Sequence, residues 1–64
     1  MVLAPQLRRI RDQRSLTQQE LADKAGVDRA TVSRAERGLN VRAPILRKLA
    51  RALGVSPATL QRSD

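Results

Sequence analysis

The chain has 64 residues, and its 13 lysines and arginines outnumber its 6 aspartates and glutamates, which gives a formal net charge of +7. A chain of this length forms one domain and buries only about 60% of its unfolded surface, so we expect marginal stability. Cysteine, histidine and aromatic residues are absent. Their absence excludes disulfides, removes the usual zinc ligands and the commonest general base, and leaves aliphatic side chains to form the core.

The positive charge favours a polyanionic partner, usually nucleic acid, although a coding bias toward arginine would produce the same composition. No apolar run approaches the roughly 20 residues that span a bilayer, and the N-terminal sequence lacks the positive end of a signal peptide. We therefore expect a cytosolic protein with no membrane partner. The sequence indicates no metal, no cofactor and no small-molecule ligand.

A first helix is predicted to open at Pro5, because the first helical position does not need the N–H that proline lacks. Leu7 and Ile10 follow at helical spacing. The next helix is predicted to begin after Thr17, since Thr17 and Glu20 form a capping-box pattern in which each side chain bonds the other residue's backbone amide.

This second helix is predicted to end at Gly26, because glycine accepts the left-handed conformation. A third helix follows almost at once, from about Arg29 to Arg37, with Asp28 as its N-cap and Gly38 as its stop. Two helices joined by such a short turn with glycine form a helix-turn-helix.

Two more helices are predicted after the polar loop LNVRA. One opens at Pro44 and ends at Gly54, and a short last helix starts at Ser56 and Pro57 and reaches about Gln61. The sequence contains no convincing strand, so the predicted fold class is all-α.

The outer face of the third helix is the candidate binding surface. At about 100° per residue, Val32 and Ala35 face inward. The outward positions are Ala30, Ser33, Arg34 and Arg37, and the first turn adds Arg29 and Thr31. Ala22, on the preceding helix, lies where the two helices cross, and a larger side chain there would push them apart.

The segment TQQELADKAGVDRATVSRAERG resembles the helix-turn-helix of the Cro and lambda-repressor-like family of bacterial and phage regulators, the XRE type. The resemblance covers about residues 5–61 and includes LARALGVSPATL, which is similar to the family's fourth and fifth helices. It implies a lambda-repressor-like DNA-binding domain of five short helices. Residues 1–64 would form this single domain, with the helix-turn-helix at about residues 17–37.

The resemblance also implies roles for individual residues. It places the third helix in the major groove and implies base contacts by Arg29, Ala30, Thr31 and Arg34. Because arginine pairs with guanine O6 and N7, we expect half-sites that contain guanine. The alternatives are that the arginines contact only phosphate or solvent, and that the Thr31 hydroxyl bonds local amides.

Backbone contacts are implied for Gln18, Arg37, Asn40 and Arg42, with solvated side chains as the alternative. Gln18 lies at a helix start, where free amides favour a phosphate, and the matching family residue often braces a side chain of the recognition helix. The resemblance further implies a partly buried ion pair between Arg11 and Glu36. This pair would fix the recognition helix against the first helix without contacting DNA.

These features favour a sequence-specific regulator of double-stranded DNA, most often a repressor that binds a two-fold symmetric operator as a homodimer. We expect the dimer contact in the C-terminal helix near Leu60, its one large apolar residue. Two alternatives remain: an antitoxin-like protein that binds a toxin and regulates its own operon, and a nonspecific nucleic-acid-binding protein. The sequence shows no catalytic constellation, so we do not expect an enzyme.

Overall fold

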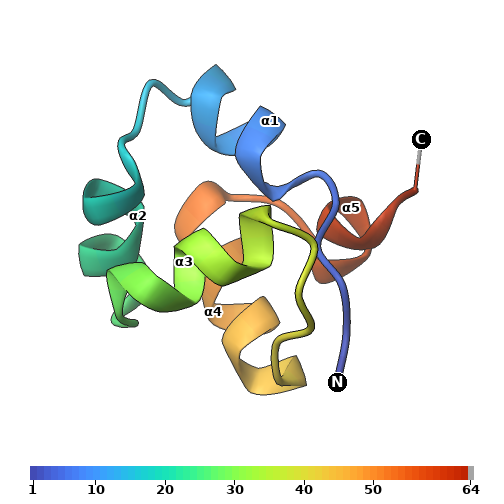
Figure 1. Ribbon diagram of the computed structural model, residues 1–64. Helices are drawn as coiled ribbons and strands as arrows, with labels where there is room; N and C mark the ends of the chain where they lie inside the picture. The colour runs from blue at the N-terminus through green and yellow to red at the C-terminus, as the bar shows by residue number, and fades with distance from the viewer. Residues whose placement is uncertain (64) are drawn as a thin grey trace.

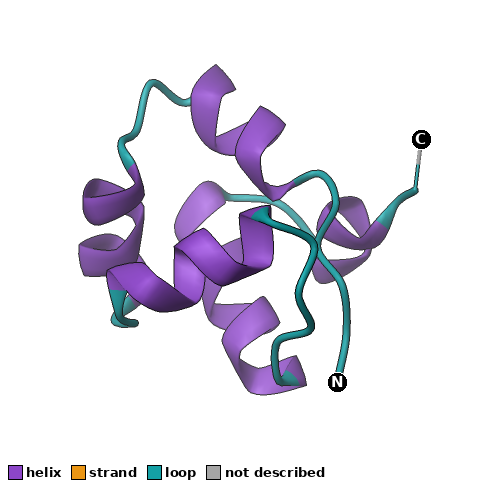
Figure 2. Ribbon diagram, viewed as in Figure 1, coloured by secondary structure: helices purple, strands orange, loops and turns teal. Residues whose placement is uncertain are grey.

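Five short helices make up the computed structural model, which describes residues 1–63 (Figure 1). In chain order they are α1 (Leu7–Gln13), α2 (Gln18–Ala25), α3 (Arg29–Glu36), α4 (Ala43–Leu53) and α5 (Pro57–Gln61). Figure 2 shows helices joined by loops and no strand over the described residues. The all-α prediction is confirmed.

The start and end of α2 follow the predicted local signals. Thr17 Oγ1 accepts a hydrogen bond of 3.0 Å from the Glu20 amide, and Glu20 Oε1 accepts one of 2.8 Å from the Thr17 amide, which completes the capping box. Gly26 ends the helix in the left-handed conformation, with φ of 72°. A side chain at this position would be strained, so the abrupt turn into α3 depends on glycine.

Two helix starts differ from the prediction: that of α1, and that of α4, which begins at Ala43 and so one residue before Pro44. The first helix begins at Leu7 and not at Pro5, because Pro5 lies in a turn that is closed by a 3.1 Å hydrogen bond from the Leu7 amide to the Ala4 carbonyl. Asp28 occupies the N-cap position of α3, but its side chain makes no capping hydrogen bond. The α3 helix ends at Glu36, so Arg37 is its C-cap.

The core is aliphatic, as the composition requires, and it draws residues from all five helices. The α2 helix packs on α3 and α4, α4 packs on α5, and α1 contacts α3. The buried apolar side chains are Ala4, Leu7, Ile10, Leu21, Ala22, Val32, Ala35, Val41, Leu46, Leu49, Ala50, Leu53 and Leu60. Ala22 is fully buried, which fits its place between crossing helices.

Leu60 is part of this core and not of the surface. Its side chain is 0% exposed, and its carbonyl accepts a 3.2 Å hydrogen bond from the Gln6 amide at the start of α1. The expectation that Leu60 offers an apolar contact to a second copy is therefore wrong. The last helix uses its one large apolar residue to close its own domain.

The loop between α3 and α4 is tied to the N-terminal segment, which the sequence did not predict. Val2 and Val41 form an isolated antiparallel bridge with two backbone hydrogen bonds of 2.8 Å. In Figure 1 the N-terminal segment begins near the start of α4 and runs beside this loop toward α1. The bridge fixes the backbone of the loop that follows the helix-turn-helix.

Thr17→Ala removes the acceptor of the capping box, so we expect it to lower the free energy of unfolding by about 1 kcal/mol. In a domain of this size the midpoint of thermal unfolding should fall by about 4–8 °C. The conservative variant Thr17→Ser keeps the hydroxyl and should retain most of the stability. Equal midpoints for Thr17→Ala and the wild type would contradict this role of the cap.

Candidate nucleic-acid interface

The α3 helix buries one face and exposes the other. Val32 is 0% and Ala35 1% exposed. Ala30, Arg34 and Arg37 are exposed on the opposite side, as their helical positions predict. Arg34 and Arg37 make no ion pair with any carboxylate in the described residues. One face of α3 is therefore fixed by packing, and the other carries unpaired positive charge.

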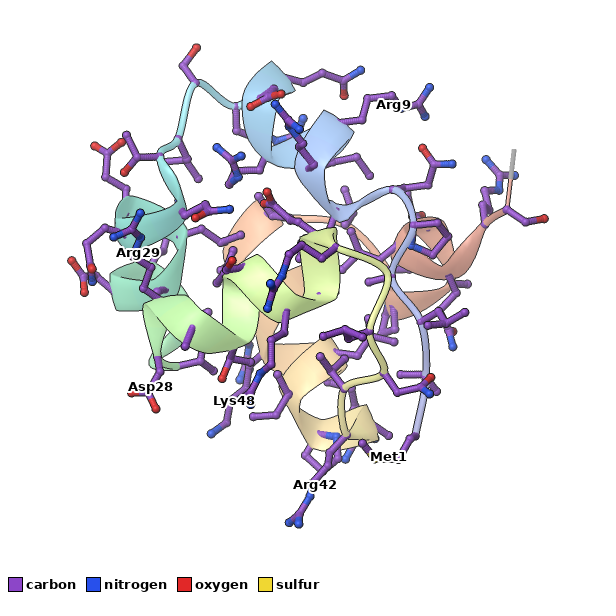
Figure 3. The ribbon with its side chains drawn as sticks, viewed as in Figure 1. Met1, Arg9, Asp28, Arg29, Arg42 and Lys48 are labelled. Atoms are coloured by element: carbon purple, nitrogen blue, oxygen red, sulfur yellow. The ribbon has the colours of Figure 1, made fainter. Side chains whose placement is uncertain are left out.

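The four predicted base-contacting residues all lie in the first two turns of α3. Arg29 and Ala30 are exposed, and Thr31 is half-buried. Figure 3 shows Asp28 and Arg29 at the start of α3, next to α2 and at the edge of the molecule. Thr31 and Arg34 lie on the other flank of the helix, toward the loop after α3.

A hollow of about 430 Å³ lies between α3, this loop and the start of α4. Six of its lining residues define it here as the α3–loop hollow: Thr31 and Arg34 from α3, Leu39, Asn40 and Arg42 from the loop, and Ile45 from α4. The structure thus brings together two predicted base-contacting residues and two predicted backbone-contacting residues. Arg29 and Gln18 are not among the residues that line it.

The loop that carries Asn40 and Arg42 has a defined path. Gly38 is left-handed, with φ of 87°, and the Leu39 amide donates a 3.1 Å hydrogen bond back to the Arg34 carbonyl. Val41 is then held by its bridge to Val2. Arg42 is the N-cap residue of α4, and Figure 3 shows its side chain extending away from the protein. Such a fixed, cationic loop suits a phosphate contact.

Glu36, at the C-terminal end of α3, is held from two other helices. Its Oε2 accepts a 2.5 Å bond from Arg11 Nε, and its Oε1 accepts a 3.0 Å bond from Arg11 Nη2. Gln18 Nε2 donates a further bond of 3.1 Å to Oε1. Arg11 itself donates through Nη1 to the Leu16 carbonyl at 2.7 Å. The network joins α1, α2 and α3 through one carboxylate.

Burial alone would raise the pKa of Glu36, because desolvation disfavours its charged form. The hydrogen bonds from Arg11 and Gln18, with the positive charges of Arg11 and Arg8, outweigh burial and lower the pKa of Glu36 below its ordinary value. The hydrogen bond to Glu36 in turn raises the pKa of Arg11. Both groups are charged in the folded protein at neutral pH.

Gln18 braces the recognition helix, as the resemblance implied, while its contact with the DNA backbone stays a prediction. It is the first residue of α2, where backbone amides are free, and its side chain braces Glu36 of α3. A side-chain amide carries two N–H donors. One is engaged by Glu36, so the second can still donate to a phosphate at the start of α2.

Leu39 and Ile45 line the hollow although the sequence pointed to neither as a binding residue. A single apolar residue in a polar loop has no periodicity that would mark it, and Ile45 has the apolar character expected of a helix residue that packs on the core.

No helix in residues 1–63 is long and apolar enough to cross a membrane. Across the same residues, no cluster of acidic side chains could hold a metal ion.

Residues 7–60 match the helix-turn-helix family. The chain belongs to this family. Its five helices, its capping box and its glycine turn are therefore those of an XRE-type DNA-binding domain. The chain is a DNA-binding transcriptional regulator of the helix-turn-helix type.

Solved structures of this type resemble the chain closely. The restriction-modification controller protein C.AhdI from Aeromonas hydrophila shares 40% identity, with a TM-score of 0.83 over 89% of this chain and 88% of that one. The hypothetical transcription factor NHTF from Neisseria shares 37% identity, with a TM-score of 0.83 over 92% of this chain and 69% of that one. The N-terminal DNA-binding domain of the biofilm regulator SinR from Bacillus subtilis shares 29% identity, with a TM-score of 0.81 over 98% and 100%. A comparison with curated proteins gave no match.

Glu36→Gln should remove most of the acid sensitivity that this network gives the fold. Because the folded-state pKa of Glu36 is lowered, its stabilisation is fully present above its ordinary pKa of 4.5 and is lost as the pH falls through the lower folded-state value. At pH 7 the variant should be less stable by about 1.5–3 kcal/mol, the usual contribution of a hydrogen bond to a charged group.

Urea unfolding of the wild type and the variant at pH 7, 5 and 3 measures this effect. The difference in stability between the two should be largest at pH 7 and should shrink toward pH 3. Asp23→Asn is the matched control, since Asp23 is exposed and its side chain accepts a hydrogen bond from Gln19 on its own helix. A difference between wild type and Glu36→Gln that stays constant with pH would refute the assignment.

Proposed function

We propose that this chain is a sequence-specific regulator that represses transcription by binding a two-fold symmetric operator as a homodimer, with α3 in the major groove. One observation carries the proposal. Arg29 and Arg34 project, unpaired, from the exposed side of a helix whose other side is fixed by packing and by the Glu36 network. Residues 1–64 act as one DNA-binding domain.

The base-reading set consists of Arg29, Ala30, Thr31 and Arg34. A guanidinium that donates two hydrogen bonds to guanine O6 and N7 discriminates against other bases by about 1–3 kcal/mol. With two arginines in the set and no asparagine or glutamine, the half-site contains guanine. Ala30 supplies an apolar surface and Thr31 a hydroxyl.

The backbone-contacting set consists of Gln18, Arg37, Asn40 and Arg42. Gln18 and Arg42 lie at the starts of α2 and α4, and Arg37 and Asn40 lie at and just after the end of α3. These positions flank the exposed face of α3, so contacts to the phosphates on both sides of the groove would set the depth and register of the helix. Such contacts add affinity without sequence information.

A homodimer is proposed from the size of the domain and the geometry of operators. The longest extent of the Cα trace is 23 Å, whereas equivalent points of two half-sites lie about 34–36 Å apart. One copy therefore reads one half-site. The similar controller protein, transcription factor and regulator domain support the regulatory role. The side chain of Leu60 is not part of the dimer surface, because the core buries it.

Binding-site selection from a pool of random duplexes, near physiological salt, tests the proposal. We expect enrichment of a two-fold symmetric site whose half-sites contain guanine. Retained DNA without an enriched motif would favour the nonspecific nucleic-acid-binding alternative. If no DNA is retained over a range of protein concentrations, the operator-binding proposal is wrong. The result would then favour the antitoxin-like alternative.

Arg34→Ala and Arg42→Ala should weaken binding in different ways. Arg34→Ala should lose about 1–3 kcal/mol on the selected site and little on unrelated duplexes, because it removes a base contact. Arg42→Ala should weaken all duplexes to a similar degree and reduce the slope of log K against log salt by about 1.

Fluorescence anisotropy titrations over a range of salt concentrations distinguish the two effects. Arg47→Ala is the matched control, since Arg47 is an exposed arginine of α4 that does not line the α3–loop hollow. Equal losses for Arg34→Ala on every sequence would exclude base reading by this residue.

A further inference from the structure

Leu39 is one of three large apolar side chains that are exposed in residues 1–63, with Met1 and Leu3 as the other two. It is 47% exposed and directly follows Gly38, the left-handed glycine two residues beyond the end of α3. A single exposed leucine is common and needs no explanation by itself. Its position is informative, because every polar residue named in the α3–loop hollow belongs to the proposed DNA-binding set.

The backbone holds Leu39 in this exposed position. The amide of Leu39 is bonded to the Arg34 carbonyl, and the bridge between Val2 and Val41 fixes the chain two residues later. Val41 takes the buried position of the loop, with 6% exposure. The leucine side chain is thus presented beside Arg34 on a constrained loop, and binding needs little further ordering of the chain.

The hollow offers an apolar surface between hydrogen-bonding groups. Leu39 and Ile45 supply that surface together with Met1 and Val41, whereas the donors around it come from Thr31, Arg34, Asn40 and Arg42. In the major groove, the C5 methyl of thymine is the one apolar group by which a base pair is distinguished. An apolar contact next to an arginine that reads guanine therefore has a specific counterpart on DNA.

We propose that Leu39 is a specificity-determining residue that contacts the C5 methyl group of a thymine close to the guanine read by Arg34. This inference rests on the proposed function, since it places α3 in the major groove. It adds thymine to the predicted half-site and extends base readout from α3 into the following loop. Contact with a deoxyribose, which carries no sequence information, is the competing outcome.

The test removes only the methyl group. Each thymine of the site selected by the wild-type protein is replaced in turn by uracil, which keeps every hydrogen-bonding group of the base. Fluorescence anisotropy then measures the dissociation constants of the wild type, Leu39→Ala and Leu3→Ala. Leu3 is the matched control, because it is a leucine with 49% exposure that does not line the hollow.

We expect one thymine position in each half-site at which uracil weakens wild-type binding by about fourfold, the equivalent of one buried methyl group. Leu39→Ala should bind the thymine and uracil duplexes equally, whereas Leu3→Ala should keep the fourfold difference. Thermal unfolding of both variants verifies that they are folded, as expected for exposed positions.

Four outcomes overturn the inference, and they can be told apart. If no uracil replacement weakens the wild type, or if Leu39→Ala retains the same sensitivity, Leu39 does not read a methyl group. If the selected site contains no thymine, the inference fails while the proposed function stands. If the wild-type protein selects no site at all, the proposed function fails and this inference fails with it.

Discussion

The position of α3 depends on one carboxylate that three helices share. Glu36 belongs to α3, and it accepts hydrogen bonds from Arg11 of α1 and Gln18 of α2. Its side chain is only 5% exposed, so the cost of removing it from water must be offset by these donors. Apolar contacts through Val32 and Ala35 can tolerate a small rotation of the helix, whereas a bidentate pair cannot. The network therefore sets the angle at which the outer face of α3 is presented.

The sequence predicts those parts of the fold that depend on neighbouring residues. Thr17 with Glu20, and Gly26 after them, set the bounds of α2 through contacts within a few residues. The start of α1 and the burial of Leu60 depend on partners far along the chain, since the Gln6 amide bonds the Leu60 carbonyl. Local patterns carry no information about such a contact. For the same reason the sequence suggested Leu60 as a contact for a second copy, whereas the structure buries it in the core.

The candidate site likewise has a part that the sequence predicts and a part that depends on contacts between distant residues. Helical periodicity identifies the outward face of α3, because Arg34 and Val32 differ by two positions and so point to different sides. It does not show that Asn40 and Arg42 converge with Thr31 on one hollow. The loop that carries both residues is held by the bridge between Val2 and Val41, a contact between distant parts of the chain. Contacts with bases and phosphates lie outside the chain and remain predictions.

The distribution of carboxylates decides which arginines are free to bind a polyanion. Within residues 1–63, the ion pairs of Asp12 and Glu36 are made with Arg8 and Arg11 of α1. Arg14, at the end of α1, donates to the Leu53 carbonyl at 3.1 Å. No carboxylate pairs with the arginines of α3 or of the following loop, so these remain hydrated in the free protein. Binding then exchanges their water and counterions for phosphates and base edges, and its strength falls with salt. Arginine thus supports the fold on α1 and presents charge on α3, and the placement of a few acidic residues separates the two roles.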